Sequence, residues 1–240
     1  MKTIFLYVYF GIYIVITLFF QIRLAYVKRY KGEDEYEKLV HKIVMSWSRN
    51  ILKTVGVKVN IKGLENIPDG TCVFVSNHQG NFDFLVILAN IDKHIGFLAK
   101  KEILKLRIVS SWMKKMHCVF INRSDVRDSL KAINQGVENI KNGYSMVIFP
   151  EGTRSKASEL GEFKKGALKL ATKTDVPIVP IVLDRTYKIF EEGNGKLKSG
   201  TVEMSILKPI NISEMDRKQR ADLSEMLRNK INDELKVIKQ

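Results

Sequence analysis

Cysteine and histidine are scarce in this chain, with two and four residues among 240. No Cys/His pattern has the spacing of a zinc site, no His-Glu-x-x-His is present, and no Gly-x-Ser-x-Gly elbow of a serine hydrolase occurs. Cys72 and Cys118 each lie in an apolar run, which predicts reduced, buried thiols rather than a disulfide. We therefore expect neither a metal nor a tightly bound cofactor.

Acidic residues are also few: 26 Asp and Glu face 40 Lys and Arg, a formal net charge of +14. Such an excess of positive charge predicts an anionic partner. The sequence contains no recognisable nucleic-acid module, so we expect no nucleic acid and favour anionic lipid headgroups and phosphorylated substrates. Hydrophobic residues make up 45% of the chain, enough for a buried core.

Charge is missing altogether from Thr3 to Ile22, a stretch long enough to match the hydrocarbon thickness of a bilayer as a helix. A signal peptide is not expected, because no small-residue cleavage site follows. Basic residues come next, at Arg23, Lys28, Arg29 and Lys31, which predicts that the rest of the chain lies at the cytoplasmic face of the cell membrane. The segment either spans the membrane or lies in one leaflet.

A second helix is predicted over 33–55, ended by Gly56. Its apolar residues recur at helical spacing and its other face is basic, as in a surface-lying membrane helix or a helix packed on a core. The predicted organisation is a two-helix membrane anchor over 1–56 and an α/β domain over 57–240.

The rest of the chain alternates short apolar runs with amphipathic segments. Strands are predicted at 57–61, 73–76, 95–99, 118–121, 146–149, 176–182 and 202–207. Helices are predicted at 84–89, 102–113, 164–172 and 216–239, with one more from a Ser124 cap to about 140. This alternation indicates an α/β fold with a mostly parallel or mixed central sheet and helices on both faces.

His78 and Asp83 stand directly after the predicted strand 73–76, at an edge where a ligand can reach them. His78 has the chemistry to take a proton from a hydroxyl, and Asp83 to hold its ring in the required tautomer. A plainer interpretation is a helix cap at Asp83 or Asn81 beside an unrelated histidine. His78 is the only one of the four histidines with a carboxylate five positions later.

A second polar cluster, Glu151 to Ser155, follows the strand at 146–149. Gly152 permits tight backbone geometry, the hydroxyls of Thr153 and Ser155 suit an anion, and Arg154 has the planar fork that grips a phosphate. The alternative is a polar turn with a solvated arginine. Because both clusters follow parallel strands, we expect them at one edge of the sheet.

Four ordered blocks carry a resemblance to a known family. Asn-His-x-x-x-x-Asp at 77–83 and Phe-Pro-Glu-Gly-Thr-Arg-Ser at 149–155, with Phe-Ile-Asn-Arg at 120–123 and Val-Pro-Ile-Val-Pro at 176–180, resemble the glycerolipid acyltransferases, in particular bacterial 1-acylglycerol-3-phosphate acyltransferases. The resemblance runs from about Gly63 to Leu183. Asn122 replaces the usual acid, and His117-Cys118 stands where the family usually has a glycine.

The resemblance implies transfer of an acyl chain from acyl-acyl carrier protein or acyl-coenzyme A to the sn-2 hydroxyl of lysophosphatidic acid, which gives phosphatidic acid. His78 would be the base, oriented by Asp83, with backbone N–H groups near Gly80 facing the oxyanion. Arg154 would hold the phosphate, aided by Arg123 and Lys100, and Glu151 would organise the loop that includes Gly152 and Thr153. Acylation of glycerol 3-phosphate or of another lysolipid or aminolipid, and a non-catalytic binder of anionic lipid, are the alternatives.

Overall fold

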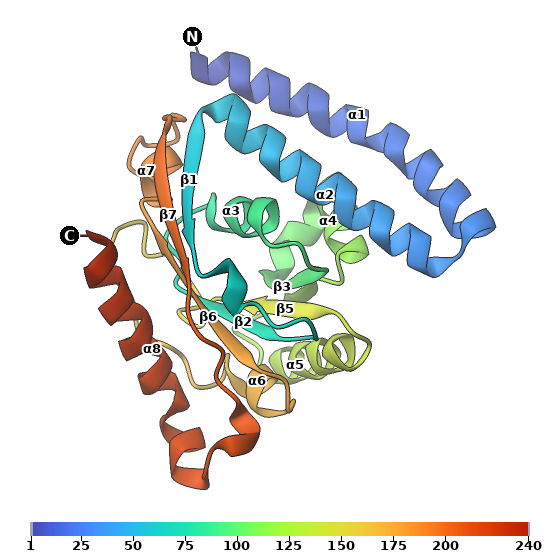
Figure 1. Cartoon of the computed structure of the whole chain (residues 1–240). Helices are drawn as coiled ribbons and strands as arrows, with labels where there is room; N and C mark the ends of the chain where they lie inside the picture. The colour runs from blue at the N-terminus through green and yellow to red at the C-terminus, as the bar shows by residue number, and fades with distance from the viewer. Residues whose placement is uncertain (1, 240) are drawn as a thin grey trace.

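A seven-stranded mixed sheet forms the centre of the protein in a computed structural model that describes residues 2–239 (Figure 1). The strands follow the spatial order β1-β7-β6-β2-β5-β3-β4. They are β1 (Val57–Lys62), β2 (Val73–Ser76), β3 (Ile95–Lys100), β4 (Val119–Ile121), β5 (Ser145–Ile148), β6 (Ile178–Asp184) and β7 (Gly200–Ile206). All neighbours are parallel except β6 and β7, which are antiparallel. The predicted strands and the mixed sheet are confirmed.

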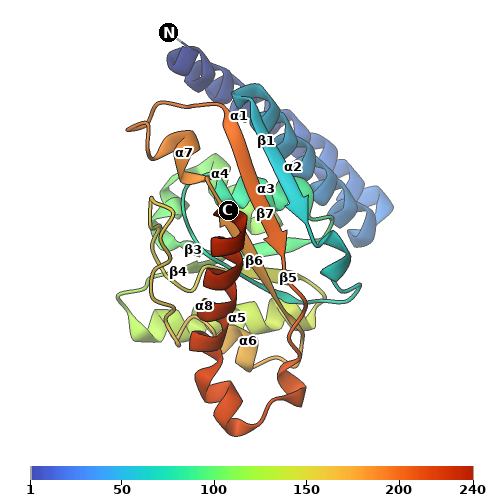
Figure 2. The same ribbon diagram turned by 60° about the vertical axis from the view of Figure 1, so that its left-hand side comes forward.

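Helices cover both faces of this sheet, as predicted (Figures 1 and 2). One face packs against α1 (Lys2–Lys31), α2 (Glu33–Val55), α3 (Asp83–Asn90) and α4 (Arg107–Lys115). The other packs against α5 (Val126–Lys141), α6 (Lys169–Thr172) and α8 (Arg217–Lys239), while the short α7 (Tyr187–Phe190) follows β6. The sheet therefore has an apolar core on each face. The central strands β2, β5 and β6 lie between the two cores, and their residues are almost wholly buried.

The helix α2 is a core-packing helix. Its apolar residues Val40, Val44, Ile51, Leu52 and Val55 are buried in the same core as one face of the sheet. Apolar residues that are buried against the sheet cannot also enter a bilayer. The core-packing interpretation of this helix is therefore correct for its apolar face, and the membrane-surface interpretation is wrong. Gly56 ends α2 in the left-handed conformation, as predicted.

The helix α1 packs along α2 (Figure 1) and also contacts the rest of the protein at several points. Leu24 and Val27 are buried, the Thr17 hydroxyl accepts a hydrogen bond from the indole of Trp112, and the Tyr7 hydroxyl donates to the Gly195 carbonyl. Its outer face is apolar and exposed, with Ile4, Val8, Ile12, Val15, Ile16, Phe19 and Ile22. Tyr7–Lys31 is the one segment of the described chain long and apolar enough to cross a membrane.

Several local predictions need correction. The helix predicted over 102–113 is split into a 3₁₀ turn, Lys101–Lys105, and α4, and only the end of the segment 164–172 is helical. Asp125, not Ser124, caps α5, because its carboxylate accepts hydrogen bonds from the N–H groups of Arg127 and Asp128. His117, in the His117-Cys118 pair noted above, adopts the left-handed conformation at φ 57°, a conformation that glycine adopts most easily.

Candidate active site

The two polar clusters meet because their strands are neighbours. β2 and β5 are parallel, with Val75 opposite Ile148, so the residues that follow them emerge at the same edge of the sheet. The N–H of Ser155 donates to the His78 carbonyl at 2.8 Å, and the N–H of Lys156 donates to the Gln79 carbonyl at 3.1 Å. The backbone thus joins the loop after β5 to the loop after β2.

His78 and Asp83 form a hydrogen-bonded pair, with 2.6 Å between the Nδ1 of His78 and the Oδ2 of Asp83. Asp83 is fully buried, whereas the side chain of His78 is 21% exposed. The imidazole stacks on the ring of Phe149 at 4.2 Å between centroids. Nδ1 is held by Asp83 and no described residue hydrogen-bonds to Nε2, so Nε2 is available to take a proton, as a general base requires.

The Asp83 carboxylate is itself held by two donors. Its Oδ2 accepts the N–H of Gly80 at 2.9 Å, and its Oδ1 accepts the hydroxyl of Thr186, a residue that sequence reasoning missed. The Gly80 N–H is therefore engaged, and the N–H of Asn81 is engaged with Glu191. Of the N–H groups near Gly80 that were expected to face the oxyanion, those of Gly80 and Asn81 therefore donate to carboxylates in this arrangement.

Glu151 links the loop after β5 to the loop after β2 through hydrogen bonds to backbone N–H groups. Its Oε1 accepts the N–H of His78 at 2.7 Å and its Oε2 accepts the N–H of Gly161 at 3.1 Å. Burial raises the pKa of this carboxyl, and the two N–H donors oppose that rise by favouring its charged form. Glu151 thus fixes backbone rather than pointing outward at a ligand.

Arg154 pairs with Glu191, at 3.1 Å between Nη1 and Oε1. Glu191 is the second residue that sequence reasoning missed: its carboxylate is 5% exposed and also accepts the N–H of Asn81 at 2.8 Å. A side chain at Gly80 would meet this carboxylate, because a Cβ there would lie 2.4 Å from its Oε2. Gly80 therefore provides the space that lets Glu191 approach the His78 loop.

The remaining predicted site residues are spread along the same edge of the sheet. Gly152 has a φ of 76°, which explains the glycine, and Thr153 beside it is exposed. Lys100 ends β3 and pairs with Glu102 at 3.0 Å, while Arg123 follows β4 and burial lowers its pKa.

The structure does not join these two cations to the centre of the site. Among residues 2–239, neither Lys100 nor Arg123 makes a hydrogen bond or ion pair with His78, Asp83 or Arg154. Nor does the described chain contain a group of three or more His, Cys, Asp or Glu residues that could hold a metal.

A family model described as acyltransferase matches residues 58–184, just over half of the chain, and this range includes all of the residues above except Thr186 and Glu191. The chain belongs to the acyltransferase family. Its Asn-His-x-x-x-x-Asp and Glu-Gly-Thr-Arg blocks are the two loops that hold His78, Asp83, Glu151 and Arg154 together.

Similar proteins carry more specific names. A chloroplastic 1-acyl-sn-glycerol-3-phosphate acyltransferase of Brassica napus is 37% identical over 85% of this acyltransferase chain and 59% of its own length. A 1-acyl-sn-glycerol-3-phosphate acyltransferase of Borreliella burgdorferi is 30% identical over 77% of this chain and 74% of its own. The crystal structure of the 1-acyl-sn-glycerophosphate acyltransferase PlsC of Thermotoga maritima matches with a TM-score of 0.85 and 26% identity, over 99% of this chain and 95% of that one. The chain thus spans about three fifths of the plant relative, and nearly the whole of the solved structure.

Proposed function

We propose that this protein transfers an acyl chain from an acyl thioester to the free sn-2 hydroxyl of 1-acylglycerol 3-phosphate, giving phosphatidic acid in phospholipid biosynthesis. The observation that carries the proposal is the His78–Asp83 pair at 2.6 Å beside the Arg154 loop. The names of the similar plant and bacterial proteins support the same acceptor.

The chemical step needs one base and no covalent enzyme intermediate. The acceptor oxygen attacks the thioester carbonyl carbon while Nε2 of His78 takes the hydroxyl proton. Collapse of the tetrahedral intermediate breaks the C–S bond, and the imidazolium returns the proton to the leaving thiolate. Asp83, with charge-assisted hydrogen bonds from Gly80 and Thr186, stabilises the imidazolium and keeps Nε2 toward the substrate. No bound cofactor takes part in this scheme.

Arg154 is the proposed phosphate ligand. One Nη1 hydrogen bond goes to Glu191, which leaves the other guanidinium donors for an acceptor phosphate. Lys100 and Arg123 are proposed to add positive charge along the edge of the sheet, and Gly152 and Thr153 to shape the loop. The donor is proposed to be acyl-acyl carrier protein or acyl-coenzyme A, both anionic and both suited to the net charge of +14.

The protein is proposed to act at the cytoplasmic face of the cell membrane, anchored by α1. Because α1 contacts the rest of the protein at Tyr7, Thr17 and Leu24, it lies against the protein and leaves only its outer apolar face exposed. Such a helix suits insertion into a single leaflet. Residues 1–56 are accordingly proposed as the anchor segment, with α1 in contact with lipid and α2 joining it to the acyltransferase unit 57–240.

The test is an acyl-transfer assay with the full chain in lipid vesicles. Labelled acyl-coenzyme A or acyl-acyl carrier protein is offered with lysophosphatidic acid, glycerol 3-phosphate and lysolipids of larger headgroup. We expect labelled phosphatidic acid from lysophosphatidic acid, and a loss of roughly a thousandfold or more in His78→Ala. His41→Ala is the matched control, because it removes another His–Asp pair, with Asp92 at 2.7 Å, outside this site.

The panel also separates the alternatives. If the protein prefers glycerol 3-phosphate or a larger lysolipid, the proposed acceptor is wrong but the proposed active site still stands. Equal turnover in His78→Ala and the unchanged protein would remove His78 as the base, and no turnover with any acceptor would leave only a binder of anionic lipid.

A further inference from the structure

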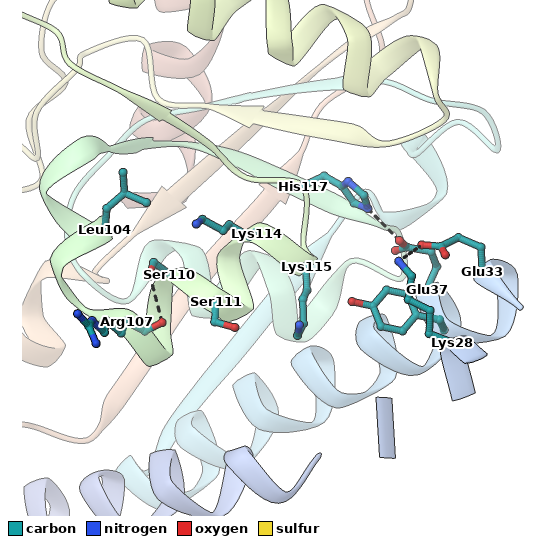
Figure 3. A pocket seen from close by; sticks show the side chains of 11 residues that line it. Lys28, Glu33, Glu37, Leu104, Arg107, Ser110, Ser111, Lys114, Lys115 and His117 are labelled. Carbon is teal, nitrogen blue, oxygen red and sulfur yellow. Dashed lines mark hydrogen bonds and ion pairs between the residues drawn. The ribbon is translucent and has the colours of Figure 1, made fainter. Parts of the chain in front are cut away.

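The N-terminal end of α1 contacts the edge of the sheet where the candidate active site lies. The Tyr7 hydroxyl donates a hydrogen bond to the Gly195 carbonyl at 2.6 Å. The turn that contains Gly195 joins α7 to β7, and it begins directly after Glu191. The other end of α1 lies at the turn to α2, where Lys28 pairs with Glu33 at 2.9 Å (Figure 3). Tyr7 therefore links α1 to the active-site edge, far from the turn between α1 and α2.

The turn that Tyr7 contacts is closed by backbone hydrogen bonds onto Glu191 and its neighbour. Asn194 and Gly195 both adopt the left-handed conformation, at φ 49° and 85°, so the chain reverses within a few residues. The N–H of Asn194 donates to the Glu191 carbonyl at 3.2 Å, and the N–H of Gly195 donates to the Phe190 carbonyl at 3.2 Å. Because only one peptide unit separates the Gly195 carbonyl from these bonds, a shift of that carbonyl also shifts the backbone at Glu191.

The Glu191 carboxylate depends on this backbone for its position. Its Oε1 accepts hydrogen bonds from the Arg154 guanidinium at 3.1 Å and from the N–H of Asn81 at 2.8 Å. Its Oε2 is buried and has no hydrogen-bond partner among the described residues. A carboxylate held through one oxygen is oriented mainly by the backbone that carries it. The turn beside Tyr7 therefore helps to determine where Arg154 is held.

Contact with lipid should strengthen the bond between Tyr7 and Gly195. Tyr7 is exposed, and so are its apolar neighbours Ile4 and Val8 on the face of α1 that is proposed to meet lipid. A phenolic hydroxyl in an apolar medium has no water to replace a lost partner, so its hydrogen bond to a carbonyl gains in strength there. Insertion of α1 would therefore favour the arrangement of the turn that the structure shows.

We propose that Tyr7 is a positioning residue for the acceptor phosphate. It holds the turn at Gly195, the turn orients Glu191, and Glu191 holds the guanidinium of Arg154. The inference rests on the proposed function, in which Arg154 binds the phosphate of lysophosphatidic acid. Tyr7 itself does not touch the substrate. In this arrangement, the helix that contacts lipid also orders the site that receives the lipid acceptor.

The test is steady-state transfer by the full chain in lipid vesicles, with lysophosphatidic acid and acyl-coenzyme A varied in turn. Tyr7→Phe removes only the hydroxyl and keeps the ring in contact with lipid. We expect the acceptor KM to rise roughly fivefold, the effect of one hydrogen bond, with kcat, the thioester KM and vesicle flotation unchanged. In an Arg154→Ala background the same change should raise the acceptor KM less than about twofold, because the group that Tyr7 positions is gone.

The matched control is Tyr26→Phe, which removes the hydroxyl of another exposed tyrosine of α1, one with no hydrogen-bond partner in the described part of the chain. It should behave like the unchanged protein. An equal rise in this control, a fall in flotation of Tyr7→Phe, or a full fivefold rise in the Arg154→Ala background would each overturn the role of Tyr7. Transfer with the same acceptor KM in Tyr7→Phe would overturn this inference alone, whereas no transfer by the unchanged protein would overturn the proposed function as well.

Discussion

The guanidinium of Arg154 is held by the buried carboxylate of Glu191, 37 residues later in the chain, at 3.1 Å. The same carboxylate oxygen accepts the N–H of Asn81, three residues beyond His78. Glu191 therefore fixes the distance between the proposed phosphate ligand and the proposed base, through contacts with both loops. This relationship makes Arg154 an ordered group at the site rather than a solvated surface cation.

Replacing Arg154 with Ala should impair use of the acceptor much more than use of the donor. Hydrogen bonds between a guanidinium and a phosphate are charge-assisted, and losing them costs roughly tenfold to a hundredfold in affinity. We expect the acceptor KM to rise by that factor while the thioester KM changes little. Steady-state kinetics with each substrate varied in turn measures both, and an equal rise in the two values would contradict the phosphate assignment.

Arg154 and Glu191 should also be coupled in stability. Arg154→Ala leaves the Glu191 carboxylate buried without its counter-charge, which should lower the free energy of unfolding by about 1–2 kcal/mol, a value reduced because Arg154 is partly exposed. In a Glu191→Gln background the same change should cost less than about half as much, since no charge is left uncompensated. Urea unfolding of the four proteins measures this coupling. Additive losses would show that the pair contributes nothing.

Thr186 should position Asp83 without touching substrate. Thr186→Val keeps the shape of the buried side chain but removes the hydroxyl that donates to Asp83 Oδ1, so the carboxylate is free to turn away from His78. We expect kcat to fall roughly tenfold with the acceptor KM unchanged. Thr186→Ser retains the donor and should restore most of the activity. A purely structural role would instead lower stability in both variants and leave kcat unaltered.

The sequence predicts those site residues that share a turn, but not those that strand order brings to the site. His78 and Asp83 share one turn, and Glu151 and Arg154 share another, so their spacing is visible in the chain. Thr186 and Glu191 follow β6, and they reach the site because β6 is the other neighbour of β2. Strand order depends on packing across the sheet, which no local pattern in the sequence reports. No motif near Thr186 or Glu191 marks them.

The same limit applies to the helices. The spacing of apolar residues predicts the bounds of α2, but it cannot tell whether Val40, Val44 and Ile51 face lipid or a sheet, because both environments select the same residues. At the start of α5, Ser124 and Asp125 both suit a cap. In the structure Asp125 is the cap, because the hydroxyl of Ser124 donates a hydrogen bond to the side chain of Asn122 at 2.7 Å.

The two cysteines should be inert in the folded protein. Both are free and buried, and burial raises the pKa of Cys72 to about 11 and that of Cys118 to about 12. A higher thiol pKa means less of the reactive thiolate at a given pH, so near neutral pH almost none is present. We expect iodoacetamide to label neither cysteine until urea is added, as measured by intact mass. Lys218→Cys, on the exposed surface of α8, is the positive control, and rapid labelling of Cys72 or Cys118 without urea would contradict their burial.

The exposed face of α1 should determine membrane attachment. Ile16 and Phe19 are 45% and 70% exposed, and replacing both with Asp removes apolar area and adds charge at the proposed lipid contact. Taking about 1.5 kcal/mol for each side chain, partition into vesicles should fall roughly a hundredfold or more. Val126→Asp is the control, because Val126 is 85% exposed on α5, on the other side of the sheet, and should not alter partition. Vesicle flotation measures the effect, and turnover of detergent-dispersed substrate checks that the site is intact. A double variant that stays on the vesicles would move the anchor away from α1.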